Sequence, residues 1–198
     1  MHGKVCHVRH PSVAPAAHLR RRPGGFARDR EPLRARIPHH CAARANSPGL
    51  LSTYRHGYEA FRDGGGVDAT EQENVVLAAS QCHDCRYCPA AHGAIVTANG
   101  VDPDVVHAVV WTTPLASPRH EALRRRTLEL VERRGHPSDE TPAELVAVGY
   151  MERQVLEVIL ANAMTTISND TNHVIHAPVD QRFARFAPEL SGVSPGVE

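Results

Sequence analysis

The chain of 198 residues is 41% hydrophobic, 22% charged and 5% aromatic, and its formal net charge at pH 7 is zero. No apolar run approaches the roughly 20 residues that cross a bilayer, and Arg, His and Pro interrupt the N-terminal stretch where a secretory signal would stand. This composition argues against a membrane protein. We expect one cytoplasmic domain, in which cysteines more often serve catalysis or metal binding than structural disulfides.

Residues 1–46 differ in charge from the rest of the chain. They contain ten Lys and Arg but only two Asp and Glu, about +8, and residues 47–198 carry the opposite charge. Five prolines interrupt any long helix, so we expect a disordered basic extension. A nucleic-acid-binding arm and a transit peptide are the alternatives. The Arg20–Arg22 run has no interleaved aromatic residues, which disfavours nucleic acid as a partner. We assign no chemistry to Cys6 and Cys41 in this extension.

Helical signals run from residue 47 to residue 188, and no stretch alternates as a strand would. Pro48 suits a first helical position. Four apolar residues then follow at helical spacing, before three glycines end the helix: Leu51, Tyr54, Tyr58 and Phe61. Further helices are expected to begin near residues 68–70, 85, 102, 117, 140, 151 and 178. The predicted fold class is all-α, with a flexible tail at residues 189–198.

The longest of these helices is expected from about residue 151. Its predicted inward-facing residues are Val155, Val158, Ile159, Asn162 and Ala163. A last short helix from Pro178 or Asp180 would carry Phe183 and Phe186. Three polar residues near the end of the long helix are weaker candidates for the functional site: Asn169, Asn172 and His173.

The stretch from Cys85 to His92 carries the strongest chemical signal. Cys85 and Cys88 stand three residues apart, and His92 follows Cys88 by four. If a helix begins at Cys85, the three side chains share one face and Cys85 lies at the positive end of the helix dipole. The dipole and the imidazole both favour thiolate, and two nearby sulfurs can close a disulfide.

The reactivity of such a pair depends on how much thiolate it holds. An ordinary cysteine has a pKa of about 8.5 and is mostly thiol at pH 7. Lowering that pKa by about 1.5 units makes thiolate about half of the population, which needs about 2 kcal/mol of stabilisation. A helix N-terminus and an imidazole can supply this, and His92 is placed to accept the proton of Cys88.

Two segments resemble the AhpD-like, carboxymuconolactone decarboxylase superfamily, in its alkylhydroperoxidase-type redox branch. They are Glu73-Asn74-Val75-Val76-Leu77-Ala78-Ala79 and Cys85-Arg86-Tyr87-Cys88-Pro89-Ala90-Ala91-His92. That branch places a glutamate twelve residues before the first cysteine and a histidine four after the second. The resemblance covers roughly residues 48–187. It implies an AhpD-like helical bundle in an intertwined homo-oligomer, with thiol-dependent peroxidase activity.

The resemblance also implies a role for each site residue. Cys88 attacks the hydroperoxide and becomes a sulfenic acid, Cys85 resolves it to a disulfide, and Glu73 with His92 forms the proton relay. No cofactor is expected to bind tightly, and an external dithiol or a lipoyl-type reductant restores the thiols. Tyr87 stands where some members carry a histidine. It is a site candidate that can donate a hydrogen bond but stays neutral near pH 7.

Two alternative functions remain open at this stage. Cys82, Cys85, Cys88 and His92 could form a structural zinc site, although four ligands along one helix would surround a tetrahedral ion poorly. A carboxymuconolactone decarboxylase-like enzyme without redox chemistry is the other alternative. The cysteine pair argues against it, because that branch does not depend on one.

Overall fold

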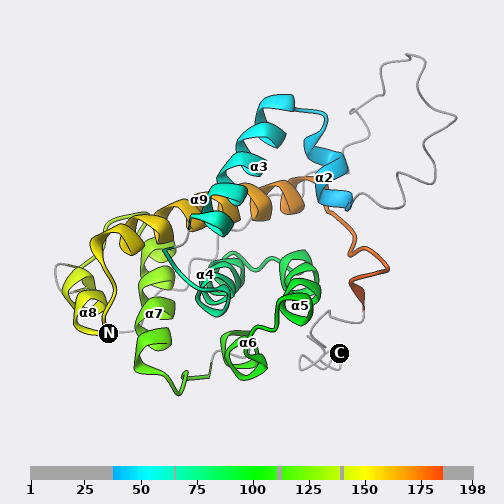
Figure 1. Ribbon diagram of the computed structural model, residues 1–198. Coiled ribbons are helices and arrows are strands. Elements are labelled where there is room, and N and C mark those ends of the chain that lie inside the picture. Colours follow the sequence, from blue (N-terminus) through cyan, green and yellow to red (C-terminus); the bar gives the residue numbers. More distant parts are fainter. Residues whose placement is uncertain (1–37, 65, 111–112, 139–140, 185–198) are drawn as a thin grey trace, which may run out of the picture. The chain divides into compact units, whose positions relative to one another are not determined.

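The computed structural model describes residues 38–64, 66–110, 113–138 and 141–184, and in these ranges it contains helices and no strand (Figure 1). The all-α prediction is confirmed. The element order is α2 (His39–Arg44), α3 (Pro48–Asp63), α4 (Ala69–Cys82), α5 (Tyr87–Asn99), α6 (Pro103–Val110), α7 (Pro118–Glu132), α8 (Thr141–Ala147) and α9 (Glu152–Ile175). No described helix combines the length and the apolar character needed to cross a bilayer.

Helix α4 is the central element. It packs against α5, α6, α7 and α9, and Figure 1 shows it enclosed by them. Every residue from 71 to 80 is buried. A helix surrounded on all sides normally needs an apolar surface all round, yet α4 buries several polar side chains. These have partners on neighbouring helices, so hydrogen bonds as well as apolar contacts orient α4.

Two apolar clusters flank α4. The larger joins it to α3, α7, α8 and α9 through residues that include Phe61, Val75, Leu123, Leu145 and Val158. The second joins it to α6 through Leu77, Ala78, Val105 and Val109. Helix α3 lies along α9, and its C-terminal turn approaches α4. The site therefore lies where α3, α4, α5 and α9 meet.

The folded unit begins earlier than the sequence predicts. Residues 39–44, which we assigned to a disordered extension, form α2 and pack against α9 and α3. The side chain of Arg44 is only 1% exposed. A helix of six residues is too short to produce a sustained apolar period, which is why the pattern analysis did not detect it. Residues 1–37 lie outside the described part.

Helix α5, which carries Cys88, begins at Tyr87. We expected Cys85 to be its first residue. After α4 the chain turns through Asp84, whose φ of 54° is left-handed. The backbone N–H of Cys85 donates back to the carbonyl of Ser80 at 3.0 Å. Cys85 therefore lies in the connection, and Cys88 lies in the first turn of α5.

Helix α9 faces the core with a slightly different surface from the predicted one. Val158 is buried as expected, but Ile159 is 48% exposed and Ala163 is exposed. The core-facing positions instead include Gln154, Ala161, Thr165 and Asn169. In place of the last predicted helix, residues 181–183 form a turn, and the expected position of Phe186 lies outside the described residues.

A capping box fixes the start of α4. The Asp68 carboxylate accepts from the backbone N–H of Glu71 at 2.8 Å, and Glu71 accepts from the N–H of Asp68 at 3.0 Å. We expect Asp68→Ala to lower the free energy of unfolding in urea by about 1 kcal/mol. Ser47 is the matched control, because it caps α3 without a side-chain hydrogen bond. Ser47→Ala should cost only a few tenths of a kcal/mol, and equal losses would contradict the role of the box.

Candidate active site

The two cysteines of the motif form a buried pair. Cys85 and Cys88 are each 3% exposed, both are free thiols, and their sulfurs lie 2.6 Å apart. Cys88 is the second residue of α5, where unpaired backbone N–H groups favour a negative charge. The helix dipole therefore acts on Cys88 more than on Cys85, the reverse of the sequence expectation.

Polar groups of α9 surround the sulfurs. Asn172 Nδ2 lies 3.5 Å from the sulfur of Cys88 and 3.8 Å from that of Cys85, so one amide donates to both. Asn169 Oδ1 accepts from the Cys88 thiol at 2.8 Å. The weak expectation that Asn169 and Asn172 approach the site agrees with these contacts. His173, by contrast, is exposed.

The paired sulfurs share their protons. The hydrogen bond with Cys88 lowers the pKa of Cys85 to about 6, although burial opposes the shift. The same hydrogen bond, followed by burial, raises the pKa of Cys88 well above its ordinary value. The pair thus loses its first proton near pH 6 and keeps the second. Near pH 7 it holds one negative charge, which the amide of Asn172 stabilises.

Glu73 and His92 are in direct contact, as the resemblance to the superfamily implies. His92 Nδ1 lies 2.7 Å from Glu73 Oε2. A carboxylate can only accept, so Nδ1 carries the hydrogen and Nε2 is left as the basic nitrogen of the neutral ring. Glu73 is fully buried. Burial raises the pKa of a carboxyl, but the charges and hydrogen bonds of His92 and Arg62 outweigh it and lower the pKa of Glu73.

Arg62 completes this network and was missed at the sequence level. Its Nη2 lies 2.6 Å from Glu73 Oε1 and donates to the hydroxyl of Tyr58 at 2.8 Å. Its Nη1 donates to Gln72 Oε1 at 3.0 Å. The only signal in the sequence is the spacing of Tyr58 and Arg62, four residues apart on one helix. That spacing does not reveal a partner eleven residues further along the chain.

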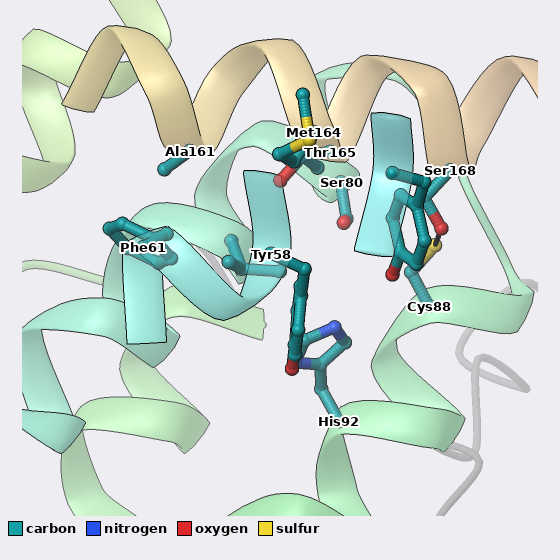
Figure 2. Close-up of a pocket in the computed structure, with 11 residues that line it drawn as sticks. Tyr58, Phe61, Ser80, Cys88, His92, Ala161, Met164, Thr165 and Ser168 are labelled. Carbon is teal, nitrogen blue, oxygen red and sulfur yellow. Dashed lines mark hydrogen bonds between the residues drawn. The ribbon is translucent and has the colours of Figure 1, made fainter. Parts of the chain in front are cut away.

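A small cavity is lined by Cys88 and His92 (Figure 2). About 10 Å³ is open to the centre of a water molecule, which is about the space that one water occupies. Cys88 and His92 both line it, and the described contacts include no direct hydrogen bond between them. Its walls come from α3, α4, α5 and α9: Tyr54, Tyr58, Phe61, Val76, Ser80, Cys88, His92, Ala161, Met164, Thr165 and Ser168. A proton can pass from sulfur to imidazole through one bridging molecule.

Tyr87 does not join this relay. Its hydroxyl donates to the buried carboxylate of Asp180 and lies 2.9 Å from His40 Nδ1. Burial and the bond to Asp180 raise the pKa of Tyr87, so the phenol stays neutral. Its contacts tie α5 to α2 and to the segment after α9. We therefore assign Tyr87 a structural role.

The zinc alternative receives no support from the geometry. Among the described residues, no three His, Cys, Asp or Glu side chains converge as metal ligands. Cys82 is exposed, whereas Cys85 and Cys88 are buried. The tetrahedral arrangement that zinc prefers is therefore not present in this part of the chain.

Comparison with known proteins agrees with the fold and the motif. Residues 48–125 match the carboxymuconolactone decarboxylase family. The fold is similar to that of an alkylhydroperoxidase AhpD core protein, an uncharacterized peroxidase-related protein from Ralstonia eutropha JMP134. The TM-score is 0.67 at 22% identity, covering 74% of this chain and 79% of that one.

A second similar structure is a cysteine-to-alanine variant of the debrominase Bmp8 in complex with 2,3,4-tribromopyrrole. Its TM-score is also 0.67, at 16% identity, covering 81% of this chain and 90% of that one. No curated relative matches the sequence. The family match over residues 48–125 and the similar fold both support the resemblance to the AhpD-like, carboxymuconolactone decarboxylase superfamily.

Proposed function

We propose that this protein is a thiol-dependent peroxidase that reduces hydroperoxides through Cys85 and Cys88. The observation that carries the proposal is the position of Cys88. Its sulfur is paired with Cys85 at 2.6 Å, and its side chain lines one cavity with His92, whose other nitrogen is held by Glu73. Nucleophile, resolving thiol and proton relay thus meet at one small space.

The chemistry proceeds in three steps. Before the attack, the cysteine pair gives its first proton to Nε2 of His92 through a bridging molecule, and the proton that the pair keeps moves to Cys85, which leaves the negative charge on Cys88. The Cys88 thiolate then attacks the terminal oxygen of the hydroperoxide, the O–O bond breaks, and the sulfur becomes a sulfenic acid. The departing alkoxide takes a proton from His92 and leaves as an alcohol. The Cys85 thiol then attacks the sulfenic sulfur, which releases water and forms the disulfide. Two electrons and two protons from an external dithiol, or a lipoyl-type reductant, restore the pair.

The size of the cavity suits the reactive end of a hydroperoxide. The cavity holds about one water-sized group, so the peroxide end of a substrate fits while its remainder needs the surrounding aromatic side chains to move.

We further propose the homo-oligomer that the superfamily implies. The exposed apolar residues Leu156 and Ile159 on α9 support it, being 65% and 48% exposed in the single chain.

The cysteine variants test the assignment of roles. We expect Cys88→Ser to abolish dithiol-dependent turnover of hydrogen peroxide and cumene hydroperoxide. Cys85→Ser should accumulate a sulfenic acid that dimedone traps, because the resolving thiol is absent. Cys82→Ser, which changes an exposed thiol, is the control and should keep wild-type turnover. Unchanged turnover in Cys88→Ser would remove the proposed mechanism.

Glu73 and Glu71 provide a matched test of the relay. Both are buried glutamates on α4 with an arginine partner, but Glu71 pairs with Arg119 at 2.7 Å, away from the cavity. Glu73→Gln removes the negative charge that holds His92, so we expect turnover to fall about 100-fold. Glu71→Gln should lower the melting temperature but leave turnover per folded molecule intact. Equal turnover in the two variants would contradict the relay.

The shared proton predicts a pH dependence. Thiolate is the reactive form and its population increases above the pKa, so the rate of iodoacetamide alkylation should be half-maximal near pH 6. In Cys88→Ala the hydrogen bond that lowers the pKa of Cys85 is lost, and the midpoint should move upward by more than one unit. A wild-type midpoint near 8.5, or no movement in Cys88→Ala, would show that the two sulfurs do not share a proton.

A further inference from the structure

Arg44 is a buried cation for which neither the superfamily motif nor the relay accounts. It lies in α2, is 1% exposed, and its guanidinium carbon lies 3.9 Å from the centre of the Tyr54 ring. Within the described residues, its Nε and Nη1 have no hydrogen-bond partner, and no carboxylate lies within ion-pair distance. Its Nη2 donates a hydrogen bond to the Ser168 hydroxyl at 2.9 Å.

A buried guanidinium without an anion is unusual, because removing a charge from water is costly unless an opposite charge compensates for it. Arginine carries a permanent positive charge in proteins. The other charged groups around the site are already engaged. Arg62 and His92 contact Glu73, and Asp180 accepts from Tyr87 and from the backbone of His39. The compensating charge for Arg44 must therefore come from another group.

The cysteine pair can supply this charge. The Ser168 hydroxyl, which accepts from Arg44, lies 4.0 Å from the sulfur of Cys88. An oxygen that accepts from Nη2 keeps its own hydrogen free to point at the sulfur. These two distances limit the separation of the guanidinium nitrogen and the sulfur to about 6.9 Å. At that range, within a buried and poorly screened space, a full positive charge still favours thiolate over thiol.

We propose that Arg44 is a positioning residue that stabilises the thiolate of the Cys85–Cys88 pair, acting through the hydroxyl of Ser168. The inference deepens the proposed peroxidase function, and it adds a charge from a segment outside the recognised motif. Tyr54, which also lines the cavity, holds the guanidinium from its other side by a cation–π contact. In this arrangement α2 closes one side of the site and supplies part of its electrostatics.

The test measures the pH midpoint of iodoacetamide alkylation in the full chain. Arg44→Met keeps much of the side-chain volume but removes the charge. We expect its midpoint to rise by about one unit, which is about ten-fold less thiolate at a given pH below the midpoint. Arg44→Lys should recover part of the shift, because it restores the charge without the guanidinium geometry. Ser168→Ala, which leaves Arg44 in place, should raise the midpoint as well.

Arg126→Met is the matched control. Arg126 is also a buried arginine, 4% exposed, whose Nε and Nη1 have no hydrogen-bond partner among the described residues, but its Nη1 lies 3.6 Å from Glu129 Oε2 on α7. The Arg126→Met variant should have a lower melting temperature but an unchanged pH midpoint of alkylation. If circular dichroism shows that Arg44→Met does not fold, the pH midpoint of alkylation of Ser168→Ala decides the test. Wild-type midpoints in folded Arg44→Met and Ser168→Ala, or an equal shift in Arg126→Met, would overturn the proposal. The readout uses no peroxide, so a lack of peroxidase turnover would not affect it.

Discussion

The fully buried carboxylate of Glu73 is the constraint on which the site depends. An ionised group with no access to water is stable only when charged or hydrogen-bonded partners replace the lost hydration. Glu73 obtains these from Arg62 of α3 and His92 of α5, one on each oxygen. A single carboxylate on α4 therefore joins three helices. Since any displacement of α3 or α5 would leave a buried charge unpaired, the relay geometry and the packing of these helices are maintained by the same contacts.

The opposite side of the cavity is built in a different way. Around the sulfurs, α9 supplies neutral donors and acceptors, with Asn172 between Cys85 and Cys88 and Ser168 beside Cys88. Neutral amides and hydroxyls can stabilise a thiolate without forming a permanent ion pair. This suits a sulfur that would lose its charge in the proposed reaction, because the α9 groups in direct contact with it are neutral. The two walls differ in polarity because Glu73 carries a permanent charge and has charged partners, whereas the sulfur carries a transient charge and has neutral partners.

Sequence reasoning succeeded where the physical cause is local. Proline at a first helical position, glycine at an end and the i, i+4 spacing of Cys88 and His92 are properties of adjacent residues, so most helices and the motif were predicted. The failures involve tertiary contacts. Helix α2 is too short to show a period, and Arg44 looks like one more charge of a basic extension until α9 and Tyr54 cover it. Arg62 is likewise indistinguishable from a surface arginine, because its partners lie on other helices. The start of α5 at Tyr87 depends on the left-handed turn at Asp84. Because Asp84 is not a glycine, the sequence does not indicate that turn.

In the proposed peroxidase reaction, the charges on the two sides of the cavity have complementary uses. A hydroperoxide is neutral, so its entry leaves the charge balance of the site unchanged. The attack then moves one negative charge from the sulfur to the departing oxygen, across a space of about one water molecule. That oxygen reaches the wall where His92 can neutralise it with a proton, while Glu73 holds the ring in the orientation that points Nε2 toward it. In the proposed mechanism, the proton lost by the cysteine pair and the charge gained by the alkoxide thus meet at the imidazole of His92. The carboxylate of Glu73, which stabilises the fold, would also orient that imidazole.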